Sequence, residues 1–336
     1  MKTIAIVAGG NSSECVISVK SAALIAGELD KSEYLCYVVQ VRGQQWEVLL
    51  PDNEKTDIDK NDFSFKHKGK KINFDCALIA IHGTPGEDGK LQSYFELVGL
   101  PYTTCGVFSS ALTFNKYACK LFLKEYGVKS AKAVLLKKNT HYSPKAIVKQ
   151  LGMPVFVKPN ESGSSFGVSK VKSVEILIDS INHAFSESDE VIIEKCISGT
   201  EITCGLFKTK EKEIIFPVTE VVSKKEFFDF EAKYTSGMSE EITPARISKN
   251  IEQICRQTSS KIYDLLNCRG IVRIDYIISG NDLYFLEVNT VPGMSPSSIV
   301  PKQIKTMGLN ISDVYKLIID EVSGSKVELH KPILQS

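Results

Sequence analysis

Two stretches near the carboxyl end decide the fold: Ile271–Ile278 reads IVRIDYII, and Leu283–Val288 reads LYFLEV and is followed by Asn289. Each is an apolar run of strand length with polar residues at alternate positions. Successive side chains of a strand point to opposite faces, so Arg273 and Asp275 share one face of the first strand. Glu287 and Asn289 share one face of the second for the same reason. The two strands can therefore bring four polar groups together.

Oxygen-bearing side chains in this pattern point to a divalent cation. The carboxylates of Asp275 and Glu287 and the amide of Asn289 are ligands that Mg²⁺ takes together with substrate phosphates. Arg273 is placed to stabilise negative charge that develops on a phosphoryl or carboxyl oxygen. Strand faces joined only by salt bridges would give the same sequence, so these two strands alone leave both readings open.

A second signal is the stretch Lys158–Gly167, which reads KPNESGSSFG after an apolar strand. Glycine lets backbone amides approach a phosphate closely, the serines add donors and Lys158 supplies a positive charge. No G-K-[ST] sequence closes the stretch, so it is not a Walker A loop, and no G-x-G-x-x-G follows the first strand of the chain. The loop is either a lid over phosphates or a plain turn.

Two further stretches are weak signals of a ligand site when each is taken alone. Glu194-Lys195 ends an apolar strand, and together with Glu201 it offers the backbone edge and carboxylate that an adenine and a ribose need. His82–Gly89 reads HGTPGEDG, and its glycines allow close contact with a ligand at a strand end. A buried structural histidine is the alternative reading of His82.

The first hundred residues alternate strand and helix patterns, which indicates a parallel α/β sheet. Strands are predicted at Ile4–Ala8, Leu35–Val41 and Cys76–Ile81, and helices at Ser18–Leu29 and Leu91–Val98. A helix over Ser109–Tyr126 and short strands then predict antiparallel α+β structure. The predicted strands are Ala133–Leu136, Val155–Lys158, Val191–Lys195, Ile202–Phe207 and Ile214–Val222, with a long helix from about Ile251 before the last two strands.

Composition narrows the class of protein. A chain of 336 residues is long enough for two or three compact units. Its 41 basic and 40 acidic residues nearly cancel, which argues against a nucleic-acid or membrane-surface partner and favours a small one. The nine cysteines show no metal-binding spacing, so we expect neither disulfides nor zinc. The apolar run Ile4–Ala8 is too short for a signal or membrane segment, so we expect a cytoplasmic protein.

Taken together and in order, these stretches resemble the D-alanine:D-alanine ligase family of the ATP-grasp superfamily. The matching residues cover nearly the whole chain: Gly9-Gly10 with Ser13-Glu14, His82–Gly89, Lys116, Lys158 with its serine loop, Glu194-Lys195, Glu231-Ala232-Lys233-Tyr234, Arg273–Asp275, Glu287–Thr290 and Pro292-Gly293-Met294. The resemblance implies an ATP-grasp fold, α/β and α+β, behind an N-terminal parallel-sheet domain. It implies units at 1–104, 105–204 and 205–336, and a homodimer.

The resemblance also implies an activity. Two D-alanines are joined through an acyl phosphate made from ATP, with ADP and phosphate released and two Mg²⁺ or Mn²⁺ ions bound. The implied metal ligands are Asp275, Glu287 and Asn289. The implied nucleotide contacts are Lys116, Lys158, Ser165, Glu194, Lys195, Ile197, Glu201 and Lys233.

Substrate roles are carried over in the same way. Glu14 is expected to receive the first ammonium group, linked to Ser164 and Tyr234, with His82 nearby. Arg273 and the Gly293 amide are the expected donors to the tetrahedral oxyanion. Ser298 and Ile299 are expected at the carboxylate of the second substrate.

Several positions depart from the family pattern. Cys15-Val16 replaces an Arg-Glu pair, Phe228 replaces a tyrosine, and Ser295-Pro296-Ser297 differs before Ser298. Three other functions remain as alternatives: a D-alanine:D-lactate ligase, whose hallmark would be phenylalanine in place of Tyr234, an inactive nucleotide-binding homologue, and a dinucleotide-dependent dehydrogenase. The missing glycine fingerprint counts against the dehydrogenase. The presence of Arg273 and all three metal-ligand candidates counts against the inactive homologue.

Overall fold

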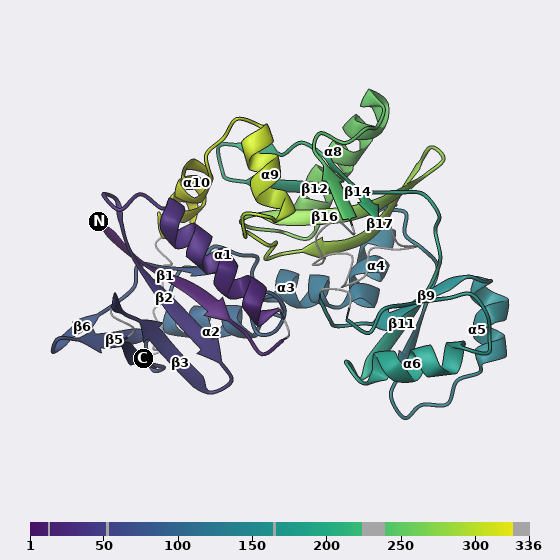
Figure 1. The fold of residues 1–336 in the computed structure, drawn as a ribbon, viewed down its shortest axis with the longest axis horizontal. Helices are drawn as coiled ribbons and strands as arrows, with labels where there is room; N and C mark the ends of the chain where they lie inside the picture. Colours follow the sequence, from purple (N-terminus) through teal and green to yellow (C-terminus); the bar gives the residue numbers. More distant parts are fainter. Residues whose placement is uncertain (13, 52–53, 164–165, 224–238, 325–336) are drawn as a thin grey trace, which may run out of the picture.

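Three β-sheets organise the chain in the computed structural model, which describes residues 1–12, 14–51, 54–163, 166–223 and 239–324 (Figure 1). The sheets follow one another along the sequence. In Figure 1 the small second sheet with its two helices lies apart from the first, and the third sheet lies nearer to both. Within the described ranges, no helix has the length and apolar character needed to cross a membrane.

The first sheet is parallel only at its centre. Its order is β6-β5-β4-β3-β2-β1-β7, built from β1 (Lys2–Gly9), β2 (Tyr34–Arg42), β3 (Gln45–Leu49), β4 (Lys55–Asp59), β5 (Ser64–His67), β6 (Lys70–Ile72) and β7 (Cys76–Ile79). Strands β2, β1 and β7 pair in parallel, as predicted; α1 (Cys15–Glu28) connects β1 to β2, and α2 (Lys90–Val98) follows β7. Strands β3 to β6 form an antiparallel extension, which ends in the β5–β6 hairpin over the lysine-rich run at 66–71.

The second sheet is antiparallel throughout, in the order β10-β9-β11-β8. Its strands are β8 (Ala133–Lys137), β9 (Val155–Pro159), β10 (Ser169–Val171) and β11 (Glu190–Lys195). Helices α5 (Pro144–Leu151) and α6 (Leu177–Phe185) pack their apolar residues on it to form one core. Helix α5 starts where Ser143 accepts a hydrogen bond from the Ala146 amide and Pro144 occupies the first turn.

The third sheet contains the two strands with alternating polar residues that were predicted near the carboxyl end. Its order is β15-β14-β12-β16-β17, with β13 paired to β12. The strands are β12 (Thr200–Lys208), β13 (Glu213–Ile215), β14 (Thr219–Ser223), β15 (Ser239–Ile242), β16 (Val272–Ser279) and β17 (Asp282–Asn289), packed against α8 (Lys249–Leu265). The single strand predicted over Ile214–Val222 is wrong. Pro217 lies in the gap between β13 and β14, where its missing N–H suits a break in pairing.

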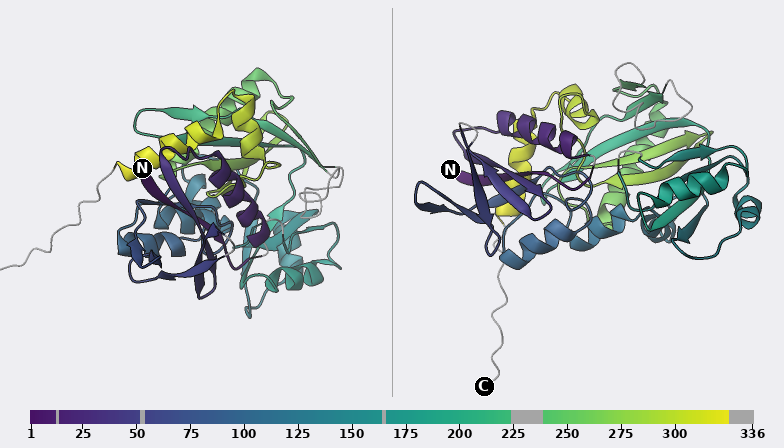
Figure 2. Two further views of the ribbon diagram at one scale, coloured as in Figure 1. Left: turned by 60° about the vertical axis from the view of Figure 1, so that its left-hand side comes forward. Right: turned by 60° about the horizontal axis from the view of Figure 1, so that its bottom comes forward.

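The helix predicted over Ser109–Tyr126 is two helices, α3 (Val107–Phe114) and α4 (Lys116–Lys124). Asn115 separates them in an extended conformation, and its side chain caps α4 by accepting a hydrogen bond from the Ala118 amide. The break puts Lys116 in the first turn of α4. Figure 2 shows α3 and α4 running between the first sheet and the second.

The carboxyl-terminal helices α9 (Ile299–Thr306) and α10 (Ile311–Ser323) return to the first sheet. Their apolar side chains share one core with β1, α1 and β7, and with Phe207 and Phe216 of the third unit. In Figure 1, α10 lies beside α1. The amino- and carboxyl-terminal parts of the chain are therefore held together by a continuous apolar core.

Candidate active site

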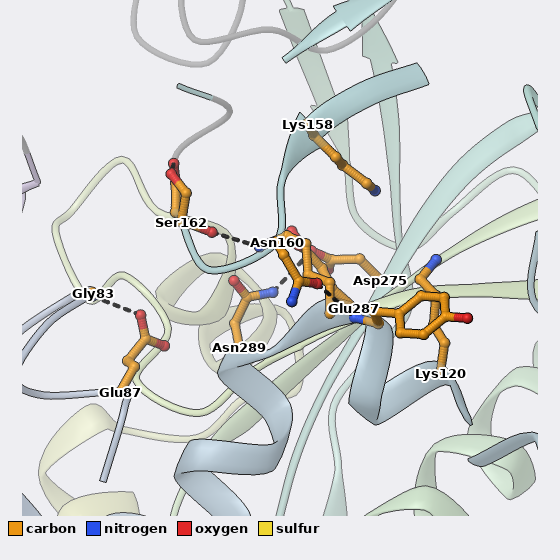
Figure 3. A network of polar contacts seen from close by, with 12 residues as sticks. Gly83, Glu87, Lys120, Lys158, Asn160, Ser162, Asp275, Glu287 and Asn289 are labelled. Atoms are coloured by element: carbon orange, nitrogen blue, oxygen red, sulfur yellow. Dashed lines mark hydrogen bonds and ion pairs between the residues drawn. The ribbon is translucent and has the colours of Figure 1, made fainter. Parts of the chain in front are cut away.

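The polar faces of β16 and β17 meet as the alternation of their residues predicted (Figure 3). Arg273 donates from Nε and Nη2 to the two carboxylate oxygens of Asp275, each at 2.9 Å. Asn289 donates from Nδ2 to Asp275 at 3.0 Å, and Thr203 of β12 donates to the same carboxylate at 2.5 Å. Asp275 is thus fixed by three strands. The three donors and the burial of the side chain hold the Asp275 carboxylate in one orientation.

The donor set suits a hard cation. The Asn289 amide nitrogen is used on Asp275, which leaves its carbonyl oxygen directed elsewhere. Glu287 lies directly across from Asp275 in the strand register and adds a second carboxylate. Among the described residues no group of three or more histidine, cysteine, aspartate or glutamate side chains could hold a metal, so a cation here would rely on two carboxylates, one amide and a ligand's own oxygens.

Two lysines approach this face from the central part of the chain. The Lys116 amine donates to the carbonyl of Ser162 at 2.5 Å and lies 3.6 Å from a carboxylate oxygen of Glu287. Lys158, near the end of β9, lies 2.5 Å from a carboxylate oxygen of Glu194. Burial lowers the pKa of Lys158, but the carboxylates of Glu194 and Glu287 outweigh it and raise the pKa. Lys158 therefore stays charged.

The loop after Lys158 is anchored to α4 by Asn160, which is fully buried. The Asn160 side-chain oxygen accepts from the Tyr117 amide at 2.9 Å, and its backbone carbonyl accepts from the Lys116 amide. The Asn160 amide group donates to Glu190 at 2.9 Å. These contacts set the start of the loop and the first turn of α4 side by side, so Lys116 and the loop form one structure.

Glu14 lies between two glycines from different parts of the chain. A Cβ on Gly163 would stand 2.3 Å from a Glu14 carboxylate oxygen, and a Cβ on Gly83 would stand 3.0 Å from one. Any larger residue at Gly163 would push the carboxylate away. The serine loop and the loop after β7 thus both close on the amino terminus of α1, where the helix dipole favours a negative charge.

His82 forms a hydrogen bond with the loop that follows β17. Its Nδ1 donates to the carbonyl of Val291 at 2.6 Å, so in the neutral ring Nε2 accepts from the hydroxyl of Ser21 at 3.2 Å. The Ser21 oxygen in turn accepts from the Met294 amide at 3.1 Å. Burial lowers the pKa of His82 and outweighs the nearby charge of Glu14, which raises it, so the ring stays neutral. His82 therefore has the structural contacts of the alternative reading and also borders Glu14.

Glu87 holds the same loop from the other side. Its two carboxylate oxygens accept from the amides of Gly83 at 2.8 Å and Val291 at 3.0 Å. Burial and the nearby charge of Glu14 raise the pKa of Glu87 to about 7. The backbone N–H of Val291 is thus hydrogen-bonded to Glu87, and its carbonyl to His82. The segment that carries Gly293 is fixed on both sides.

Gly293 and Ser298 also lie together. A Cβ on Gly293 would stand 2.9 Å from the hydroxyl oxygen of Ser298, so a larger residue would displace that hydroxyl. Ser298 is the N-cap residue of α9, and Ile299 is the first residue of that helix. A helix amino terminus offers free amides and a positive dipole end, which suit a carboxylate.

The expected adenosine contacts lie along the end of β11 and the start of β12. Glu194 is buried, and each of its carboxylate oxygens faces a different lysine, Lys120 and Lys158. Lys195 is exposed, whereas Ile197 and Glu201 are half-buried. The structure brings Glu194 to Lys158, one of the two lysines expected at the phosphates, and leaves the Lys195 side chain at the surface.

Other expected residues lie outside the part of the chain that the structure describes. They are Ser164 and Ser165 of the serine loop, and Lys233, Tyr234 and Phe228. The departures at Cys15 and Val16 begin α1, where the Val16 side chain is exposed. Ser295, in the third departure, is buried and hydrogen-bonds to Ser298 at 2.8 Å between hydroxyls.

Four residues of this region were missed from the sequence: Ser21, Glu87, Lys120 and Thr203. Lys120 had a usable signal, because it stands four positions after Lys116 and so shares a helix face with it. Glu87 stood inside a stretch that was singled out only for its glycines. Ser21 and Thr203 carried no signal, because their partners lie more than 60 positions away.

Comparisons with known proteins show the family to which the chain is similar. Residues 3–105 match the family model described as the D-ala D-ala ligase N-terminus, and residues 122–320 match the model of the D-ala D-ala ligase C-terminus. The D-alanine--D-alanine ligase of Phocaeicola vulgatus is 51% identical over 320 residues, covering 95% of this chain and 98% of the relative.

Solved structures show the same fold. The D-alanyl-alanine synthetase A of Vibrio cholerae superposes with a TM-score of 0.87 at 27% identity, covering 96% of this chain and 99% of that one. The D-alanine--D-alanine ligase of Bacillus anthracis, solved in complex with ATP, gives 0.77 at 28% identity, covering 96% of this chain and 97% of that one.

Proposed function

The chain belongs to the D-alanine–D-alanine ligase family, and we propose that it joins two D-alanine molecules into D-alanyl-D-alanine, a cell-wall precursor, while ATP is converted to ADP and phosphate. One observation carries this proposal at the site. Lys116, which holds the serine loop, also lies 3.6 Å from Glu287 on the polar face of β17. The proposed phosphate-binding element and the proposed cation-binding face are thus adjacent, as phosphoryl transfer requires.

The nucleotide is proposed to lie between the second and third sheets. Lys116 and Lys158 would contact its phosphates, with Ser165 and Lys233 adding donors. Glu194, Lys195, Ile197 and Glu201 would surround the adenosine. The support is that Lys116 lies beside Glu287, that Lys158 pairs with Glu194, and that the charges of Glu194 and Glu287 raise the pKa of Lys158.

Asp275, Glu287 and Asn289 would hold two Mg²⁺ or Mn²⁺ ions, which neutralise charge on phosphate oxygens when bound. Arg273 fixes Asp275 in one orientation through both of its oxygens. That contact pre-orders the carboxylate, and the same guanidinium can face a ligand oxygen.

The reaction is proposed in two steps. A carboxylate oxygen of the first D-alanine bonds to the γ-phosphorus as the bond from that phosphorus to the ADP oxygen breaks. The amine of the second D-alanine then attacks the carbonyl carbon of the acyl phosphate, loses a proton and displaces inorganic phosphate. Arg273 and the Gly293 amide are the proposed donors to the oxyanion of this second step.

The two amino acids are proposed to bind on either side of this centre. Glu14 would receive the ammonium of the first, with His82 beside it and Ser164 and Tyr234 closing the site. Ser298 and Ile299, at the amino terminus of α9, would receive the carboxylate of the second. The support for Glu14 is its place between Gly83 and Gly163, where both loops meet α1.

Product analysis tests this proposal. The protein is incubated with ATP and D-alanine, L-alanine or a mixture of D-alanine and D-lactate, and the products are separated by chromatography. Dipeptide from D-alanine alone is expected. Depsipeptide as the main product of the mixture would instead assign a D-alanine:D-lactate ligase, and ATP binding without turnover would assign an inactive homologue.

Tyr234→Phe sharpens the distinction between acceptors. By family resemblance, a phenylalanine here accompanies depsipeptide synthesis, so the variant is expected to gain D-alanyl-D-lactate formation at mildly acidic pH, where the competing amine is protonated. Equal use of D-lactate by the parent and the variant at every pH would reject Tyr234 as the selector.

We further propose a cytoplasmic homodimer, on family resemblance. Leu97 of α2 and Phe108 of α3 expose their apolar side chains, as a partner surface would. Light scattering at working concentration should give twice the chain mass of 37.2 kDa. A mass equal to one chain would reject the dimer.

A further inference from the structure

Lys120 is a buried cation that the proposed reaction does not use. It lies one turn after Lys116 on α4, and only 4% of its side chain is exposed. Its amine pairs with a carboxylate oxygen of Glu194 and finds no other hydrogen-bond partner among the described residues. A lysine is almost never buried this deeply unless its charge is paired, and here Glu194 is the partner.

Lys120, Glu194 and Lys158 form a trio, which we call the lysine–glutamate–lysine trio (Figure 3 labels both lysines). Each carboxylate oxygen of Glu194 faces one lysine, and the contact with Lys158 is 2.5 Å. Burial raises the pKa of Glu194, but the two lysines outweigh it and bring the pKa to about 2. The trio therefore holds a charged carboxylate between two lysine amines.

The two lysines differ in what they can reach. The side chain of Lys158 is 14% exposed, and Lys158 begins the serine loop, whereas Lys120 is enclosed by the core around α4. Burial lowers the pKa of Lys120, and Glu194 only partly offsets this, so the Lys120 charge depends on that carboxylate. Lys158 can turn toward a phosphate, and Lys120 stays with Glu194.

The difference between Lys158 and Lys120 affects the charge balance around Glu194 when a nucleotide binds. A buried carboxylate that loses its only counter-ion is strongly disfavoured. If Lys158 were the only partner of Glu194, moving Lys158 to a phosphate would leave such a carboxylate behind. With Lys120 in place the carboxylate keeps one partner, and the positive charge in excess is the one on Lys158.

We propose that Lys120 is a positioning residue for the nucleotide: it remains the counter-ion of Glu194, so that Lys158 is free to bind phosphate. The inference rests on the proposed ATP site and goes beyond it, because Lys120 itself touches no nucleotide. It makes the affinity for ATP depend on a side chain buried behind the site.

The test compares Lys120→Met and Lys120→Gln with Lys124→Met, an exposed lysine of the same helix. Glutamine can still donate a hydrogen bond to Glu194 but carries no charge, so it separates charge from hydrogen bonding. The affinity for a non-hydrolysable ATP analogue is measured by calorimetry, the KM for D-alanine by ADP release, and the melting temperature by scanning fluorimetry.

Both Lys120 variants are expected to bind the analogue about tenfold or more weakly, with the KM for D-alanine changed less than about threefold. Lys124→Met should bind within about twofold of the parent. In a Lys158→Met background, adding Lys120→Met should weaken binding by less than about twofold, because no Lys158 remains to be freed.

Other outcomes separate the possible failures. Unchanged analogue affinity in a Lys120 variant that folds would overturn the inference, whatever its melting temperature. Equal losses from Lys120→Met in the parent and in the Lys158→Met background would overturn it as well, because the two lysines would then act independently. A parent protein that does not bind the analogue at all would instead reject the proposed ATP site.

Discussion

The guanidinium of Arg273 holds both carboxylate oxygens of Asp275, with Nε and Nη2 each 2.9 Å from a different oxygen. The two residues stand two positions apart on β16 and share its polar face. Burial lowers the pKa of Arg273, but Asp275 outweighs it and raises the pKa, so the charge is permanent. The forked contact gives the candidate metal face a fixed geometry before any ligand binds.

Arg273→Lys should lower kcat by roughly two to three orders of magnitude, because a lysine cannot hold both oxygens and offers a less directed donor. The measurement is ADP release at saturating substrates. Arg246→Lys is the matched control, because Arg246 makes a similar fork on Glu220. Equal activity in the two variants would remove Arg273 from the reaction.

Glu287→Gln should cut kcat by roughly three orders of magnitude at saturating Mg²⁺, because it removes one of two carboxylates at the proposed metal face and leaves the shape unchanged. Asp282→Asn removes an exposed carboxylate from the same strand and serves as control. Circular dichroism should be the same for both. Near-normal turnover by Glu287→Gln would reject the metal assignment.

Gly163→Ala should raise the KM for D-alanine by about tenfold, because the new Cβ would stand 2.3 Å from a Glu14 carboxylate oxygen. The KM for ATP should change less. Gly27→Ala, where a Cβ would meet nothing within 4 Å, is the control and should behave as the parent. If Gly163→Ala and Gly27→Ala had the same KM for D-alanine, Glu14 would not bind the amino acid.

Glu87 should make the stability fall as pH rises. Burial raises the pKa of its carboxyl to about 7, above the ordinary 4.5, so the folded chain holds the proton more tightly than the unfolded chain. That contribution, up to about 3 kcal/mol, is present below about pH 4.5 and lost as pH passes about 7. The melting temperature should fall more steeply over this range than in Glu87→Gln. Parallel curves would contradict the raised pKa.

Alternation of polar residues predicted the core of the site from sequence. A strand points every second side chain to one face, so the convergence of Arg273, Asp275 and Asn289 needed no knowledge of the fold. The central parallel strands followed in the same way from apolar runs between helices. These features depend on neighbours in sequence, which is why they could be read directly.

Features that depend on distant residues could not be predicted. The break at Asn115 was missed because a capping asparagine inside a continuous helical pattern looks like a surface residue. The hydrogen bonds of Glu87 to Val291 and of Ser21 to Met294 join the amino-terminal part of the chain to the loop after β17. The packing of α10 on the first sheet is likewise visible only in three dimensions.

Oxygen transfer tests the central claim of ATP-dependent ligation through an acyl phosphate. D-Alanine labelled with ¹⁸O in both carboxylate oxygens is converted with unlabelled ATP, and the inorganic phosphate is analysed by mass spectrometry. One ¹⁸O per phosphate is predicted, because the carboxylate oxygen that attacks the γ-phosphorus leaves with phosphate when the amine displaces it. Phosphate without label, released as fast as ADP, would show that water attacks ATP and would contradict the account.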